Sequence, residues 1–169
     1  MFTAKALLTK WGLYTAATAV FLLLQNLVLD SLQLLGVVPF LAPLIVAVVA
    51  AWEGSTQGTL FGIAFGFVCD LLGGSVFPGA YTLSFFCIAL CVSLLAASVV
   101  MPNIFGSFLY ALIAFLLLDL VQGLYLLLFC HAAPLPILSL AGRELLVSIL
   151  FVIPVFFLFR YLHHLFRYD

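Results

Sequence analysis

Glycine recurs at every fourth position in residues 58–70, GTLFGIAFGFVCD, and the series starts one step earlier at Gly54. Residues four apart share one face of an α-helix, so Gly58, Gly62 and Gly66 predict a helix with a smooth stripe. Small residues at this spacing allow a second helix to approach closely inside a membrane. We expect the stripe to pack against a neighbouring helix of the same chain; the alternative is a docking face for a partner protein.

The composition of the whole chain excludes a soluble globular domain. Of its 169 residues, 67% are hydrophobic and 7% are charged, against roughly 45–50% and 25% in soluble domains. A membrane-crossing helix needs about 20 apolar residues, so about six crossings use up the chain. We therefore expect one transmembrane domain over residues 1–169, an all-α membrane fold built as a compact bundle of about six helices.

Apolar runs separated by polar or proline-rich turns mark the expected spans. They cover residues 11–29, 34–52, 56–72, 81–100, 104–130 and 140–161. Pro39 and Pro43 predict that the first half of the second run is extended or kinked, and Pro154 predicts a kink in the last. An alternative topology has four full spans and a re-entrant hairpin over residues 39–72.

The basic residues indicate the orientation. With six spans, Lys5, Lys10, Arg160 and Arg167 fall on one side of the membrane and Arg143 alone falls on the other. Lysine and arginine gather on the cytoplasmic side of membrane proteins. The sequence therefore predicts that both termini are cytoplasmic.

Ionisable residues within apolar spans are costly, and they often mark functional sites. The six-span topology places Asp70, Asp119 and Arg143 in the outer half of the membrane, together with Asn26 and Gln122. We expect Arg143 to pair with Asp70 or Asp119, because an unpaired charge at that depth costs about 2.5–3.5 kcal/mol. This outer polar cluster is either a structural ion pair or a functional pocket. The inner half has no comparable charge away from its boundary.

No motif for catalysis or cofactor binding stands out. The sequence has no Ser/His/Asp set around a nucleophile turn, no phosphate-binding glycine loop and no basic run for nucleic acid. Its four cysteines lie in or at the ends of apolar runs, where cysteine behaves as a small hydrophobe. His163 and His164 are typical of a charged interfacial tail. We expect no enzymatic activity, cofactor or metal.

Three motifs in order resemble a known family. Pro43 opens an apolar helix that ends at Trp52, the run GIAFGFVCD follows at residues 62–70, and Gly79 opens the next helix. From Pro43 to Leu83 the chain resembles the bacterial rod-shape-determining MreD family; elsewhere the resemblance lies in length, span count and hydropathy. The positions that match the family are Pro43, Gly62, Gly66, Phe67, Asp70 and Gly79.

The resemblance implies a multi-pass protein of the bacterial cytoplasmic (inner) membrane. Such a protein is a non-catalytic scaffold or regulator of the elongation machinery, the elongasome, which maintains rod shape through lateral peptidoglycan synthesis and cell wall biogenesis. The implied partners are MreC, as the direct one, the MreB filament, and RodA with its penicillin-binding transpeptidase. The resemblance also implies a fold similar to the substrate-binding S components of energy-coupling-factor transporters.

A second function fits the same residues. The outer polar cluster of Asp70, Asp119 and Arg143 lies where an outward-facing ligand pocket would open. The alternative is therefore a substrate-binding membrane subunit of a small-molecule, vitamin-type transporter.

Overall fold

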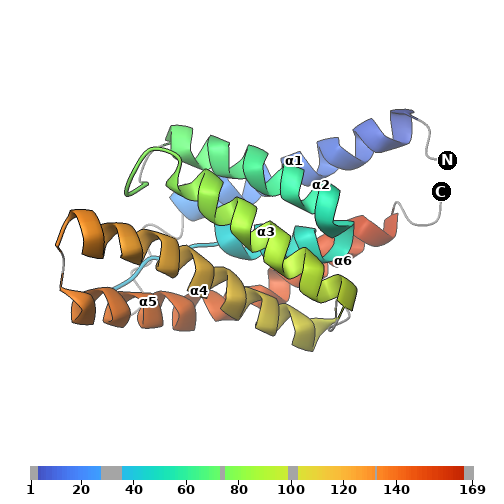
Figure 1. The fold of residues 1–169 in the computed structure, drawn as a ribbon. Coiled ribbons are helices and arrows are strands. Elements are labelled where there is room, and N and C mark those ends of the chain that lie inside the picture. The colour runs from blue at the N-terminus through green and yellow to red at the C-terminus, as the bar shows by residue number, and fades with distance from the viewer. Residues whose placement is uncertain (1–3, 28–35, 73–74, 99–102, 132, 166–169) are drawn as a thin grey trace.

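The computed structural model describes residues 4–27, 36–72, 75–98, 103–131 and 133–165. Figure 1 shows these residues as a bundle of helices, and this part of the chain contains no strand. The helices are α1 (Ala4–Leu27), α2 (Ala42–Leu72), α3 (Ala80–Ser98), α4 (Ile104–Phe129), α5 (Pro134–Ser148) and α6 (Val152–Leu165), with a 3-10 turn, η2 (Ile149–Phe151), between the last two.

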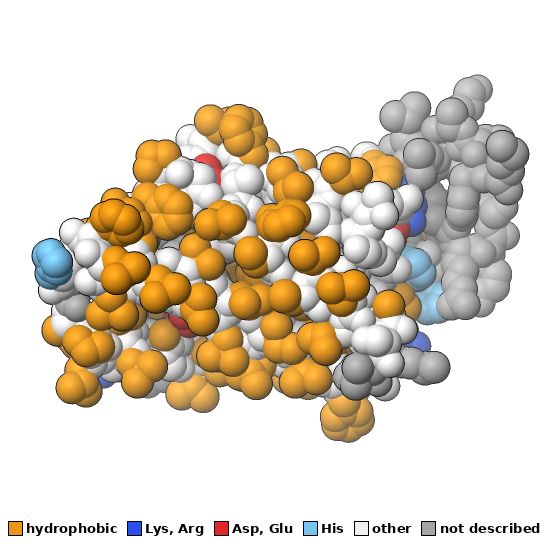
Figure 2. Space-filling view, viewed as in Figure 1, with side chains coloured by type: hydrophobic (Ala, Val, Ile, Leu, Met, Phe, Trp, Pro, Cys, Tyr) orange, Lys and Arg blue, Asp and Glu red, His pale blue; other side chains and the backbone are white. Residues whose placement is uncertain are grey.

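Four helical stretches are long and apolar enough to cross a membrane. They are Ala42–Leu72, Ala80–Ser98, Ile104–Phe129 and Pro134–Leu165. Figure 2 shows hydrophobic side chains spread along the length of the described face, as expected for a surface in contact with lipid. The prediction of an all-α membrane fold is confirmed at this level.

The helix α2 consists of two halves that fold back on each other at Gly54. Gly54 has φ 79° and ψ −176°, a conformation that favours glycine. A Cβ added to Gly58 would lie 2.6 Å from Cα of Ala50, whereas eight residues span about 12 Å along a straight helix. In Figure 1 the first half runs toward the end where α1 begins and α6 ends, and the second half runs back. We call this the terminal end of the bundle, and the opposite one the far end.

A short non-helical segment, residues 37–41, leads into the first half of α2. The backbone N–H of Phe40 donates to Oγ of Ser148 at 3.2 Å, and that of Leu41 donates to Oε1 of Gln25 at 3.0 Å. Irregular backbone at membrane depth is tolerated where the protein itself satisfies it. The expected extended or kinked start of the 34–52 run thus corresponds to a segment that is not helical over residues 37–41, with helix from Ala42 onward.

The core surrounds the first half of α2. Residues 41–50 are all buried, and they pack against large buried side chains of the other helices, among them Tyr14, Phe85, Tyr110 and Phe159. A helix that is apolar all round is typical of such a central position.

Several helix bounds differ from the expected spans. The first helix begins at Ala4 rather than at residue 11, and the last helical stretch begins at Pro134 rather than at residue 140. Proline is common in the first turn of a helix, because the N–H groups there have no partner within the helix. The interruption lies at η2, just before Pro154, which cannot donate to the carbonyl of Leu150. The expected ends of the spans at residues 29 and 100 lie outside the described residues.

Candidate functional site

The glycine stripe faces the protein's own helix α3. A Cβ on Gly62 would lie 2.8 Å from the carbonyl oxygen of Phe85, and one on Gly66 would lie 2.6 Å from Cα of Thr82. Real Cβ atoms do not approach this closely, so the two helices leave no room for a side chain. Together with Gly58 against Ala50, these contacts form a closed seam of α2 with itself and with α3. The structure supports internal packing rather than a docking role for the stripe.

The other positions of the motif lie around this seam. Pro43 is buried in the first turn of α2, and Gly79, with φ +85°, directly precedes α3. Phe67 differs from both, because 57% of it is exposed on the outer face of α2. Among the motif residues, Phe67 is thus the one whose side chain is placed to meet lipid or a partner.

Asp70 holds the first turn of α3. Its carboxylate accepts the backbone N–H groups of Tyr81 at 3.1 Å and of Thr82 at 2.9 Å, and the Thr82 hydroxyl at 2.7 Å. The first N–H groups of a helix have no partner within the helix and attract negative charge. Asp70 therefore acts as a cap supplied by a neighbouring helix.

The expected pairing of Arg143 with Asp70 or Asp119 is not formed. Within the described residues, ion pairs join Glu53 to Lys10 and to His163, and Arg143 makes none. Asp70 is already held by α3, and Arg143 is exposed on α5, where a long basic side chain can reach toward polar surroundings. The three residues of the outer polar cluster thus lie in three separate settings.

An acidic centre at the terminal end was not expected from the sequence. The Glu53 side chain is 2% exposed, and its carboxylate contacts Lys10, accepts the Tyr14 hydroxyl at 2.8 Å, and lies 3.1 Å from Nδ1 of His163. The ring of Trp52 lies 5.0 Å from that of His163. This Glu53 centre ties α1 and α6 to the turn of α2, so His163 is part of the packed body.

A signal for this centre was present in the sequence. Glu53 is an acidic residue between two apolar runs on the side of the membrane assigned to the basic termini. A buried carboxylate requires partners, and Lys10 and His163 lie on that same side.

Polar residues from four segments line a cavity of about 350 Å³ toward the far end. The polar members come from α1, α3, α4 and α5, and the apolar ones come from the non-helical segment and from Leu118 on α4. The lining residues are Gln25, Asn26, Val38, Pro39, Phe40, Tyr81, Leu118, Gln122 and Glu144. Asn26 and Gln122, which the sequence placed in one half of the membrane, do meet here. We call this the polar pocket.

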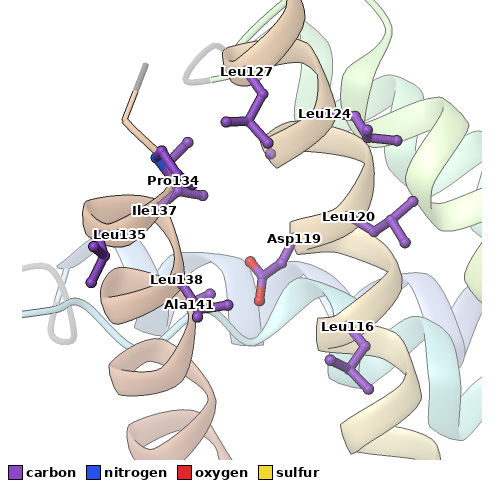
Figure 3. Close-up of a pocket in the computed structure, with 11 residues that line it drawn as sticks. Leu116, Asp119, Leu120, Leu124, Leu127, Pro134, Leu135, Ile137, Leu138 and Ala141 are labelled. Carbon is purple, nitrogen blue, oxygen red and sulfur yellow. The ribbon is translucent and has the colours of Figure 1, made fainter. Parts of the chain in front are cut away.

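Asp119 lies in a different place, a groove of about 500 Å³ between α4 and α5. Figure 3 shows its carboxylate directed into the space between the two helices, among leucine side chains. No hydrogen bond or ion pair to Asp119 is formed by the described residues. We call this the α4–α5 groove.

The described residues contain no group of three or more His, Cys, Asp or Glu able to hold a metal ion. Comparisons of the chain with protein-family models, curated proteins and solved structures gave no match. The assignment of a function therefore depends on the residues and their geometry.

Proposed function

We propose that this protein is a non-catalytic membrane scaffold or regulator of the bacterial elongation machinery, which maintains rod shape through lateral peptidoglycan synthesis. Its partners would be MreC, as the direct one, the MreB filament, and RodA with its penicillin-binding transpeptidase. The observation that carries the proposal is the ordered run of motifs from Pro43 to Leu83, which resembles the MreD family.

The geometry of that run supports the proposal. Its glycines pack against Ala50 and α3, and its aspartate caps α3. The glycines and the aspartate of the motif thus join the two halves of α2 and the start of α3 into one closely packed unit. A scaffold needs such a unit, because it acts by holding partners in a fixed arrangement rather than by chemistry.

We further propose that the chain crosses the bacterial inner membrane six times, with both termini in the cytoplasm. Residues 37–41, if extended, span about 16 Å, and the 12 residues from Ala42 to Glu53 add about 18 Å. Their sum matches the roughly 30 Å of a bilayer core, which favours a full crossing over a re-entrant hairpin. We also propose a fold similar to the S components of energy-coupling-factor transporters, for which six membrane-crossing helices are likewise expected.

Depletion in the native bacterium tests this function. Cells that lose the protein should become round, and MreC should co-purify with it from solubilised membranes. In depleted cells, Gly66→Leu should neither restore rod shape nor co-purify MreC, because it opens the seam. Gly12→Leu, on α1 at a position with nothing within 4 Å, should do both. Normal rods after depletion, together with no cell-wall partner in the purified sample, would refute the proposal.

The polar pocket favours a second candidate, a small-molecule binding subunit of a transporter. Binding sites for small ligands are concave and hold a few convergent polar groups in a volume of roughly 300–1,000 Å³. The pocket has this size and offers amides from Gln25, Asn26 and Gln122 beside the Glu144 carboxylate. These groups suit a polar, uncharged or cationic ligand.

Thermal stabilisation separates the two candidates. A transporter subunit should melt at a higher temperature with one member of a panel of water-soluble vitamins, and Gln122→Leu should remove the shift. The matched control is Leu116→Ala, which lies on α4 outside the polar pocket. A panel without any shift contradicts this second function and leaves the scaffold proposal standing.

A further inference from the structure

We propose that the α4–α5 groove is the docking site for a transmembrane helix of another protein, and that this helix carries a lysine or arginine near its midpoint that pairs with Asp119. The inference deepens and rests on the proposed scaffold function, since it gives the scaffold a surface by which to hold a membrane partner.

The shape and chemistry of the groove fit an apolar helix that has one basic residue. Its walls are leucines of α4, such as Leu120 and Leu124, and of α5, such as Leu135 and Leu138, and the carboxylate of Asp119 is directed between them. An apolar groove with one acidic group is complementary to an apolar helix with one basic group.

The depth of Asp119 excludes lipid headgroups as its partner. Asp119 lies ten residues before the end of α4 at Phe129 and 15 residues after its start at Ile104, which corresponds to about 15 Å and 22 Å along the axis. This is close to the middle of a 30 Å hydrocarbon core. Acyl chains can fill the groove but offer no hydrogen-bond donor, whereas a side chain on another helix can present one at this depth.

Most of α5, which forms one wall of the groove, is not buried against the rest of the protein. Within α5, the buried residues are Val147 and Ser148, both in its last turn. From Pro134 to Leu146 the helix keeps much of its apolar surface open, with Leu135 79% and Leu138 75% exposed. Large exposed apolar surfaces of this kind are common at interaction sites.

A defined peptide pair tests the proposal. The full chain, labelled with a donor fluorophore, is reconstituted in phosphatidylcholine vesicles with an acceptor-labelled leucine–alanine helix of about 22 residues. One version of the peptide has lysine at its centre and the other has leucine. Association is measured by energy transfer at increasing dilution with lipid. For the wild-type protein we expect about tenfold tighter association of the lysine peptide.

Two variants and a control locate the preference. Asp119→Leu should abolish the preference for lysine, and Asp119→Asn should reduce it, with melting curves confirming that both variants are folded. Leu94→Ala, an exposed position on α3, should keep the full preference. Equal association of the two peptides, or a lysine preference that persists in Asp119→Leu, would overturn the proposal.

Other occupants give distinct results that also overturn it. If lipid alone fills the groove, neither peptide transfers energy above the level of random mixing. If a second copy of the chain fills it, a mixture of donor-labelled and acceptor-labelled wild-type protein shows energy transfer without peptide, and the same mixture of Asp119→Leu does not. None of these samples contains another protein of the elongation machinery. The peptide result can therefore be interpreted even if the proposed cell-shape role fails.

Discussion

Acidic residues have partners on one side of this bundle and lack them on the other, among the described residues. On the α2–α3 side, Glu53 and Asp70 each have several partners, and the glycines leave no space between the helices. On the α4–α5 side, Asp119 has no partner among the described residues, and a groove opens between the two helices. The difference indicates that the closed side maintains the fold, whereas the open side retains an unsatisfied group that another molecule can satisfy.

The largest effect is expected at the Glu53 centre. Glu53→Ala should lower the free energy of unfolding by about 3 kcal/mol or more, because it leaves Lys10 without its buried counter-charge. Denaturation in mixed micelles measures this loss. The double variant Lys10→Met/Glu53→Leu should be more stable than Glu53→Ala alone, and a double variant that is no better would show that the pairing is not the cause.

The second-largest loss of stability is expected at the seam between α2 and α3. Gly66→Leu forces a side chain against the backbone of Thr82, and such overpacking costs about 2–3 kcal/mol. Gly142→Leu, in open space, is the matched control and should melt like the wild type. Equal melting of both variants would mean that α2 and α3 are not in close contact.

A smaller loss is expected at the cap. Asp70→Asn keeps the size of the side chain but replaces one acceptor oxygen with a donor, which faces the N–H groups of Tyr81 and Thr82. We expect a loss of about 1–2 kcal/mol, measured as for the seam, with faster hydrogen exchange in the first turn of α3. Unchanged exchange there would contradict the capping role.

The open side should show no loss. Asp119→Leu removes an unpartnered carboxylate from an apolar groove, so the isolated protein should be as stable as the wild type or more stable. A loss above about 1 kcal/mol would show that Asp119 has a structural partner, and the contrast between the two sides of the bundle would then disappear.

The sequence predicted the parts of the fold that depend on local pattern. Apolar runs identified most of the helices, the prolines at 39 and 43 indicated the non-helical entry to α2, and the spacing of Gly62 and Gly66 indicated a close helix contact. The boundary at Pro134 was missed, because a proline-rich turn and the first turn of a helix look alike in sequence.

The pairing of charges could not be predicted in the same way. Glu53 and His163 are 110 residues apart, and only the packing of α6 against the turn of α2 brings them together. Arg143 was expected to pair with Asp70 or Asp119, but backbone N–H groups of α3 satisfy Asp70 instead. Backbone donors are present in every sequence, so composition gives no sign of them.

The non-helical segment before α2 imposes an order on how the protein is made. The N–H groups of Phe40 and Leu41 depend on Ser148 and Gln25, and Ser148 emerges from the ribosome more than a hundred residues after Phe40. Until then the segment has an unsatisfied backbone group that lipid cannot accommodate. We expect chains truncated after residue 130 to be held by the insertion machinery or degraded, which pulse-chase labelling would show. The N-terminal half should therefore complete its packing only after the C-terminal helices have entered the membrane.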